Sequence, residues 1–403
     1  MQLNSAFCSL FAVTFTAVYG QSAAPNLTSI LSSIPELASV NDLVLATPAL
    51  LELLMNWPTN LTIVAPSNGA FDELKWINST ARDSASTVGN SIDIIEAILF
   101  YHILNGRYLS SLFVQGNTAV ASTLLMNNTF ANLPNNAPQV ILGRNDGIVT
   151  FYSGLGIGAK VERADILFNQ GVIHIIDHVL NLPYTVSETA AYFSLTALSG
   201  ALVKTGLLET FDNTPGLTIF APNNAAFQII GNIATGLSTS QLTEVLNYHA
   251  VNHTIYDITG AQAQDIRVAS VQGGELTINE NQGGWFVNGA RIIGGKEGGI
   301  VVGNGIVYII DGVLNPAHGE ITTTFTPNPI LSTQPPAFLS ASFVTEVPFI
   351  TELVTGTPTS SATETPTSGS DVSSSTTLEA IPISFAALVI ALFMSGLGGF
   401  FMV

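Results

Sequence analysis

The sequence predicts two tandem α+β domains, because three stretches occur twice in the same order. The first, at residues 61–74 and 217–230, joins a buried strand to a short helix. The second is a helix that ends in Tyr-His, and the third is a continuous apolar strand at residues 171–181 and 305–315. Uninterrupted apolar strands are typical of positions covered on both faces. Each domain is therefore expected to have a central strand between other layers.

The first stretch has the composition of a strand that turns sharply into a helix. Its opening residues are β-branched, aliphatic or aromatic, as a pleated core favours. Pro66 and Pro222 end the two strands, because proline cannot donate to a ladder. Ser67 and Asn223 follow as good helix N-caps. The sequence thus predicts the same strand–turn–helix corner in both domains.

Helices and hairpins are expected around this corner. Residues 30–54 are leucine-rich and broken by prolines, which favours two or three short helices. Residues 91–104 have helical periodicity, and the second copy opens with a capping box, Ser238 to Gln241. Residues 119–161 and 269–293 alternate short apolar runs with Gly and Asn, which is typical of antiparallel hairpins.

The domain boundaries follow from the repeat. Domain 1 spans residues 25–182 and domain 2 spans residues 184–316. Only residues 183–187 separate the last strand of domain 1 from the next helix, so the two domains are expected to lie close together.

The N-terminus resembles a secretory signal peptide. Residues 1–20 contain an apolar run, with cleavage expected near Gly20 or Ala23. The alternative is a first core helix. The single cysteine, Cys8, lies in this leader, so the mature protein needs a full hydrophobic core instead of disulfides.

The C-terminus has the pattern of a glycosylphosphatidylinositol (GPI) attachment signal. Residues 317–380 are rich in Ser, Thr and Pro and predict a disordered, O-glycosylated stalk. Small residues at Ser368, Gly369 and Ser370 precede a polar spacer and the apolar tail 381–403. A transmembrane helix is the alternative for the tail, because its length could span a bilayer. The protein is therefore expected on the outer leaflet of the plasma membrane or in the cell wall.

The composition fits a secreted glycoprotein and not a nucleic-acid-binding protein. The net charge is −18, whereas phosphate binding needs clustered Lys and Arg. Five Asn-x-Ser/Thr sequons are candidate glycosylation sites: Asn26, Asn60, Asn78, Asn127 and Asn252.

Taken together, residues 62–71, 101–102 and 169–180, with their second copies at 218–227, 248–249 and 304–314, resemble the fasciclin (FAS1) domain. The resemblance covers about 290 residues. It implies an α+β domain in which a twisted antiparallel β-wedge is flanked by short helices. It also implies a role in adhesion or matrix contact, without catalysis or a cofactor.

Asp165 and Ile166 are the candidate binding residues, and this assignment comes from the resemblance. Animal fasciclin proteins carry an Asp-Ile before the last strand that is implicated in integrin binding. Domain 2 has Gly299-Ile300 at that place. The alternative is that Asp165 caps a loop and Ile166 packs inside. An exposed Asp165 is expected to contribute less than about 0.5 kcal/mol to stability.

The histidines are expected to be structural. His102 and His249 lie on the apolar faces of their helices, which favours buried, hydrogen-bonded core residues, with Tyr101 and Tyr248 beside them. His174 and His178 would share one face of a strand, which suggests a metal pair. Domain 2 has Tyr308 and Gly312 there, and a metal site needs further ligands, so no metal is predicted.

The sequence therefore predicts a surface glycoprotein that acts by binding cell-surface or extracellular-matrix proteins or polysaccharides. It contains no nucleophile elbow or phosphate-binding loop that would indicate an enzyme. Adhesion is the leading interpretation, and a structural cell-wall component that binds polysaccharide is the alternative.

Overall fold

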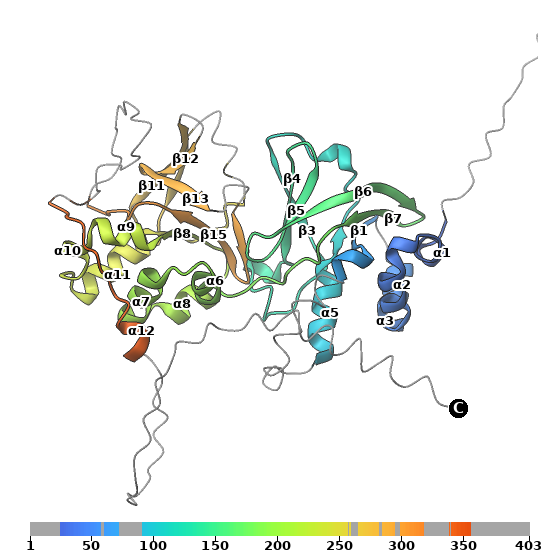
Figure 1. Ribbon diagram of the computed structural model, residues 1–403, viewed down its shortest axis with the longest axis horizontal. Coiled ribbons are helices and arrows are strands. Elements are labelled where there is room, and N and C mark those ends of the chain that lie inside the picture. The colour runs from blue at the N-terminus through green and yellow to red at the C-terminus, as the bar shows by residue number, and fades with distance from the viewer. Residues whose placement is uncertain are drawn as a thin grey trace, which may run out of the picture.

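Two domains lie side by side in the computed structural model, with their sheets adjoining and their helices toward the outer ends and lower face (Figure 1). The residues that the structure describes are 25–57, 60–71, 91–256, 258, 265–281, 284–294, 299–317, 338 and 340–355. The predicted signal peptide, Asn78, the predicted GPI site and the apolar tail lie outside this set. Within it, no helix is both long and apolar enough to cross a membrane.

Domain 1 places a seven-stranded sheet, counted over its described residues, against a helical layer. The strands run in the order β2-β1-β7-β6-β5-β4-β3. The helices are α1 (Leu27–Ser33), α2 (Ala38–Leu45), α3 (Pro48–Met55) and α5 (Ser91–Tyr101), with short 3-10 turns at Pro35–Leu37, Ser110–Leu112 and Pro134–Asn136. The strands are β1 (Leu61–Pro66), β2 (Ile103–Asn105), β3 (Thr118–Ser122), β4 (Val140–Asn145), β5 (Val149–Tyr152), β6 (Gly158–Phe168) and β7 (Gly171–Ile176).

Domain 2 repeats this plan. Its sheet order is β10-β11-β12-β13-β15-β8-β9, with β14 also paired to β15. The helices are α6 (Val186–Tyr192), α7 (Thr196–Thr205), α8 (Leu208–Asn213), α9 (Asn224–Ile229), α10 (Gly231–Ala234) and α11 (Thr239–Tyr248). The strands are β8 (Leu217–Pro222), β9 (Ala250–Val251), β10 (Ile266–Ala269), β11 (Glu275–Asn281), β12 (Gly284–Val287), β13 (Ala290–Gly294), β14 (Ile300–Val302) and β15 (Gly305–Ile310).

The repeated corner and the central strand form where the sequence predicts, although β7 and β15 end at Ile176 and Ile310, before the predicted ends at residues 181 and 315. Every residue of β1, β7, β8 and β15 is buried. Asn223 caps α9 by accepting a hydrogen bond from the backbone N–H of Ala226, and Ser238 and Gln241 form the predicted capping box of α11. These predicted caps form because they supply hydrogen-bond acceptors to helix N–H groups that have no partner within the helix.

Two local expectations need correction. Among the described strands the pairing is antiparallel except for one parallel pair in each sheet, β1 with β7 and β8 with β15, because the first and last strands of each domain run the same way. The helix expected over residues 91–104 ends at Tyr101. Ile103 and the next two residues instead form β2, where they pair with β1.

The two domains share a continuous apolar interface. Val140 and Leu142 of β4 belong to the same buried cluster as the sheet residues of domain 2. Gln139 has no exposed surface, and its amide nitrogen donates to the carbonyl oxygens of Phe130 at 2.8 Å and Val302 at 3.2 Å. Its amide oxygen accepts the backbone N–H of Val140 at 3.0 Å. One side chain thus joins the backbones of both domains, in agreement with the short linker.

Replacing Gln139 by Ala is expected to lower the free energy of unfolding by about 1–3 kcal/mol, because buried backbone groups on both sides lose their partner. Thermal unfolding followed by circular dichroism measures the change. Gln115→Ala, at an exposed position in the same domain, is the control. Equal melting temperatures for the two variants would contradict this role for Gln139.

Part of the predicted stalk is folded against domain 2. Residue 338 and residues 340–355, which we call the strap, lie along its helical layer and include α12 (Glu352–Thr355). Figure 1 draws the strap in orange to red, running past α10 toward α7. The prediction of a disordered stalk was therefore wrong for this segment. The apolar residues that anchor the strap are few and irregularly spaced, so the composition of residues 317–380 did not indicate folding.

Candidate binding site

Asp165 lies in β6 at a bulge beside the central strand β7. The register of β6 against β7 shifts between Arg163 and Ile166, and Asp165 adopts a left-handed backbone with φ of 59°. Such a φ is uncommon for residues other than glycine, although Asp and Asn tolerate it best. The bulge turns the Asp165 side chain away from the ladder, as bulges commonly do at functional sites.

The Asp165 carboxylate is bound to Ser110, 55 residues earlier in the chain. It accepts the backbone N–H of Ser110 at 2.9 Å and also the Ser110 hydroxyl. Partial burial would raise the pKa of Asp165, but these two hydrogen bonds from Ser110 oppose it, and the pKa lies below its ordinary value. The carboxylate therefore stays ionised while being held in place.

Two exposed leucines lie near Asp165, on the same surface as the exposed Glu162 and Arg163. Leu167 stands two positions along the strand, beyond the bulge, and is 47% exposed. Leu112 shares the 3-10 turn of Ser110 and is 55% exposed. Ile166 faces the other way, where it pairs with Ile173 and packs against the core. The exposed apolar residue that follows the bulge is thus Leu167 and not Ile166.

Domain 2 preserves the backbone of this site and loses its charge. Gly299, the counterpart of Asp165, also has a left-handed backbone, with φ of 99°. A Cβ atom on Gly299 would overlap the side chain of Ile306. The repeat therefore conserves a left-handed position, which Asp occupies in domain 1 and Gly in domain 2.

His174 and Tyr308 occupy equivalent positions and perform the same structural task. His174 Nε2 lies 2.7 Å from the carbonyl oxygen of Tyr108, and the Tyr308 hydroxyl donates to the carbonyl oxygen of Ile255 at 2.8 Å. His174 Nδ1 accepts the backbone N–H of Asp165 at 3.3 Å. Both ring nitrogens are engaged, and burial lowers the pKa of His174, so the ring is neutral.

The structure does not place His174 and His178 on one strand face. β7 ends at Ile176, so His178 lies beyond the strand and places its Nδ1 2.7 Å from a carboxylate oxygen of Asp177. Within the described part of the chain, no three His, Cys, Asp or Glu side chains are grouped as metal ligands.

Each Tyr-His pair ties its helix to two other parts of the domain. Tyr101 and Tyr248 donate to the carbonyl oxygens of Val140 and Glu275, the first residues of β4 and β11. The two histidines are buried and point to the segment after the central strand. This confirms the prediction of hydrogen-bonded core histidines.

The histidine bonds are the same in both domains. Nδ1 of His102 donates to the Ile98 carbonyl at 2.8 Å, and its Nε2 accepts the Leu180 backbone N–H at 2.9 Å. His249 makes the same two bonds, to Val245 at 2.7 Å and Leu314 at 2.8 Å. Burial lowers the pKa of each histidine to about 4, against a smaller opposing effect of the carbonyl bond.

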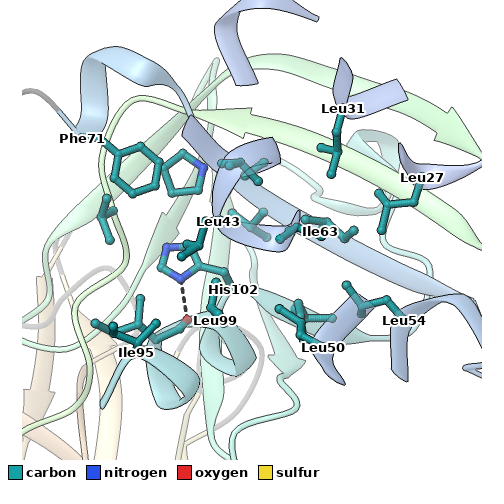
Figure 2. Close-up of a pocket in the computed structure, with 18 residues that line it drawn as sticks. Leu27, Leu31, Leu43, Leu50, Leu54, Ile63, Phe71, Ile95, Leu99 and His102 are labelled. Carbon is teal, nitrogen blue, oxygen red and sulfur yellow. Dashed lines mark hydrogen bonds between the residues drawn. The ribbon is translucent and has the colours of Figure 1, made fainter. Parts of the chain in front are cut away.

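An apolar cavity of about 50 Å³ adjoins His102 between the helices and β1 of domain 1. Figure 2 shows Leu27, Leu43, Leu50 and Ile95 around it, with the His102 ring bound to a carbonyl oxygen. An engineered apolar cavity that binds benzene is about three times larger, so this one has room for little more than the end of an aliphatic side chain. The ring nitrogens of His102 are both engaged, and the cavity therefore offers no polar group to a ligand.

The four described sequons are exposed at their Asn residues: Asn26, Asn60, Asn127 and Asn252. Asn26 caps α1, and its side-chain oxygen accepts the Ser29 N–H, while the amide nitrogen is the atom that glycosylation modifies. Occupancy of the sequons stays a prediction.

Replacing Asp165 by Ala is expected to destabilise the protein by about 1–2 kcal/mol, more than the sequence suggested, because Ser110 loses two hydrogen bonds. Chemical denaturation measures the change, with Glu162→Ala, an exposed carboxylate on the same strand, as the control. A loss no larger than that of the control would show that the Ser110 contact contributes nothing.

Sequence reasoning did not find Ser110, Leu112 or Leu167. Ser110 is remote in sequence, and only the fold brings it to Asp165. Leu167 carried a usable signal, because strand alternation places Ile166 and Leu167 on opposite faces.

Comparison with known proteins agrees with the resemblance to the fasciclin domain. The fasciclin domain model matches residues 35–183 and 193–316. A fasciclin-like arabinogalactan protein of Arthroderma benhamiae is 27% identical over 340 residues, covering 84% of this chain and 76% of the relative. The fasciclin-like arabinogalactan protein elcF of Phaeosphaeria nodorum is 26% identical, covering 72% and 89%. Human periostin is 26% identical, covering 66% of this chain and 30% of its own length. With the corner, the Tyr-His helix and the central strand matched in both halves, the chain belongs to the fasciclin family as a tandem pair of its domains.

Proposed function

We propose that this protein is a secreted cell-surface glycoprotein that mediates adhesion, with the binding surface on domain 1. The observation that carries this proposal is the surface formed by Asp165, Leu112 and Leu167, which we call the Asp165 patch. It combines a fixed carboxylate with exposed leucines, and domain 2 has glycine in place of the carboxylate.

The Asp165 patch has the chemistry of a small protein-binding surface. An ionised carboxylate has about four lone-pair positions, and Ser110 uses two of them. The remaining positions can accept hydrogen bonds from an arginine or lysine of a partner. Leu112 and Leu167 offer apolar area beside it, as interface centres require. Membership of the fasciclin family, for which the resemblance implies adhesion or matrix contact, supports a binding role without catalysis.

The proposal includes anchoring through a GPI group, for which the sequence pattern of residues 368–403 is the support. A chain ending at Thr377 should then appear in the medium. Phosphatidylinositol-specific phospholipase should release the complete protein from cells, provided that the inositol of the anchor is not acylated. Finding residues 381–403 in the mature protein by mass spectrometry would contradict it.

The adhesion test uses beads that carry the ectodomain, residues 25–377, at matched glycosylation. Asp165→Asn removes the charge with little change of shape, and Leu167→Thr removes exposed apolar area. Each is expected to weaken cell attachment about tenfold, the effect of losing about 1.4 kcal/mol at an interface. Val271→Thr, at a site 47% exposed in domain 2, is the control and should attach like the wild type.

Two outcomes would count against the Asp165 patch. Unchanged attachment of both variants would remove it as the binding surface. If no version attaches to cells while the ectodomain retains cell-wall polysaccharide, the protein is a structural wall component instead. The arabinogalactan names of its relatives and the exposed sequons give that alternative its support.

A further inference from the structure

We propose that the helical layer of domain 2 is a peptide-binding groove whose ligand is the strap of the same chain, and that this contact sets where the stalk leaves the ectodomain. The groove is formed by α7, α9 and α10, and the strap meets each of them through contacts specific enough to define a site.

Two glycines form the floor of the groove. A Cβ atom on Gly200 of α7 would overlap the carbonyl oxygen of Phe349, and one on Gly231 of α10 would overlap the side chain of Val344. Glycine lowers helix stability relative to alanine, so two helical glycines are explained by the close approach of the strap.

Phe349 is the anchor of the strap. It is 6% exposed, and its ring meets Phe227 of α9 edge-on with centroids 6.0 Å apart. The Lys204 ammonium lies over the same ring, 5.2 Å from its centroid, and is 3.7 Å from the Glu352 carboxylate. Aromatic contact and burial of this kind are what a peptide anchor residue supplies.

Polar contacts fix the register of the strap. The Val344 N–H donates to the Gln228 carbonyl at 2.9 Å, and the Gln228 side chain donates to the Thr345 carbonyl at 2.8 Å. The Asn232 side chain binds the strap backbone twice. Its amide nitrogen donates to the Ser340 carbonyl oxygen at 3.1 Å, and its amide oxygen accepts the Ser342 N–H at 2.6 Å. Side chains that bind the backbone of an extended segment specify its position independently of its sequence.

Domain 1 cannot accept the strap in this way. Asn68 and Asn224 bind the backbone N–H of Ser39 and Ala197 in the same manner, which aligns α2 with α7 and places Asp42 at the position of Gly200. The Asp42 side chain would occupy the space that Phe349 uses in domain 2. The groove is therefore specific to domain 2.

The consequence for tethering rests on the GPI anchor proposed above, whereas the groove itself does not. From residue 317 to the predicted attachment site near Ser368 there are about 50 residues, which extend to roughly 170 Å. From Thr355 there are about a dozen, which extend to roughly 40 Å. Docking of the strap thus shortens the tether about fourfold and fixes it to the helical face.

The test cuts the chain between domain 2 and the strap and measures whether the strap stays bound in the groove. A site-specific protease sequence is inserted between residues 326 and 327 of the complete chain, the protein is displayed on cells, and the linker is cleaved. The wild-type ectodomain should stay on the cells, held by its strap. Phe349→Ala and Gly200→Asp should release it at least a hundredfold faster, the order expected for losing a buried phenylalanine.

Phe343→Ala is the matched control, since Phe343 lies in the strap but is 63% exposed. It should be retained like the wild type. Release of the wild-type ectodomain at the rate of Phe349→Ala would overturn the proposal. If no protein reaches the surface before cleavage, the anchor proposal fails. The same cleavage of purified protein then tests the groove without the anchor. Co-elution of the two fragments would support binding of the strap in the groove, and separation of the fragments would overturn it.

Discussion

Domains 1 and 2 are each expected to lose roughly 3 kcal/mol of stability as the pH falls from 6.5 to 4, because each buries a neutral histidine. The pKa of His102 and of His249 is lowered from 6.5 to about 4 in the folded protein, chiefly by burial. One pKa unit corresponds to about 1.4 kcal/mol, which gives this magnitude. Since domains are stable by about 5–15 kcal/mol, the loss is large.

The direction follows from proton binding. Between pH 6.5 and 4 the unfolded chain binds a proton at each histidine and the folded chain does not, so acid favours unfolding. The atomic reason is that Nε2 of each histidine accepts a backbone N–H, from Leu180 or Leu314. A proton on Nε2 would remove that acceptor and leave a buried N–H without a partner.

Guanidinium unfolding at pH 7.5, 6.5, 5.5 and 4.5 tests this with His249→Gln beside the wild type. The variant should be less stable by about 1–3 kcal/mol at pH 7.5, and the gap should close as the pH falls, because the variant has no histidine to protonate there. His253→Gln, at an exposed position of the same domain, is the control. A gap that stays constant over this range would show that His249 does not govern the acid response.

Replacing Gly171 or Gly305 by Ala is expected to destabilise its domain by more than about 4 kcal/mol, the range reserved for severe core defects. Each glycine begins the central strand and pairs with the first residue of the neighbouring parallel strand, Leu61 or Leu217. A Cβ atom on either glycine would overlap the carbonyl oxygen of that leucine. The backbone of a buried strand has no room to move aside, so the parallel pair would break.

Secreted yield and chemical denaturation measure this effect. Gly69→Ala is the control, because Gly69 is exposed in the helical turn of residues 68–71 that follows β1, and a Cβ atom there meets nothing closer than 3.7 Å. That change should be neutral or stabilising by up to about 1 kcal/mol. If Gly305→Ala unfolds at the same denaturant concentration as Gly69→Ala, the close approach between β15 and β8 does not exclude a side chain at Gly305, and the prediction is wrong.

The sequence by itself determined the domain repeat and its local elements. Pro66 and Pro222 end their strands, Ser238 and Gln241 cap α11, and His102 and His249 are buried. These features depend on neighbouring residues and on hydrophobic periodicity, which the chain carries locally. The repeat strengthened the predictions of the strand ends and the buried histidines, because two copies with different side chains indicate the same backbone.

Tertiary structure alone decided which distant groups meet. Nothing near Asp165 in the sequence indicates that Ser110 binds its carboxylate, or that its backbone is left-handed like that of Gly299. The strap is the clearest case, because a segment with the composition of a stalk becomes ordered where Gly200 and Gly231 leave room for Phe349 and Val344. Composition predicts whether a segment can bury enough apolar surface on its own. Whether a groove elsewhere in the fold supplies the missing surface is decided by shape, which only the packed helices of domain 2 provide.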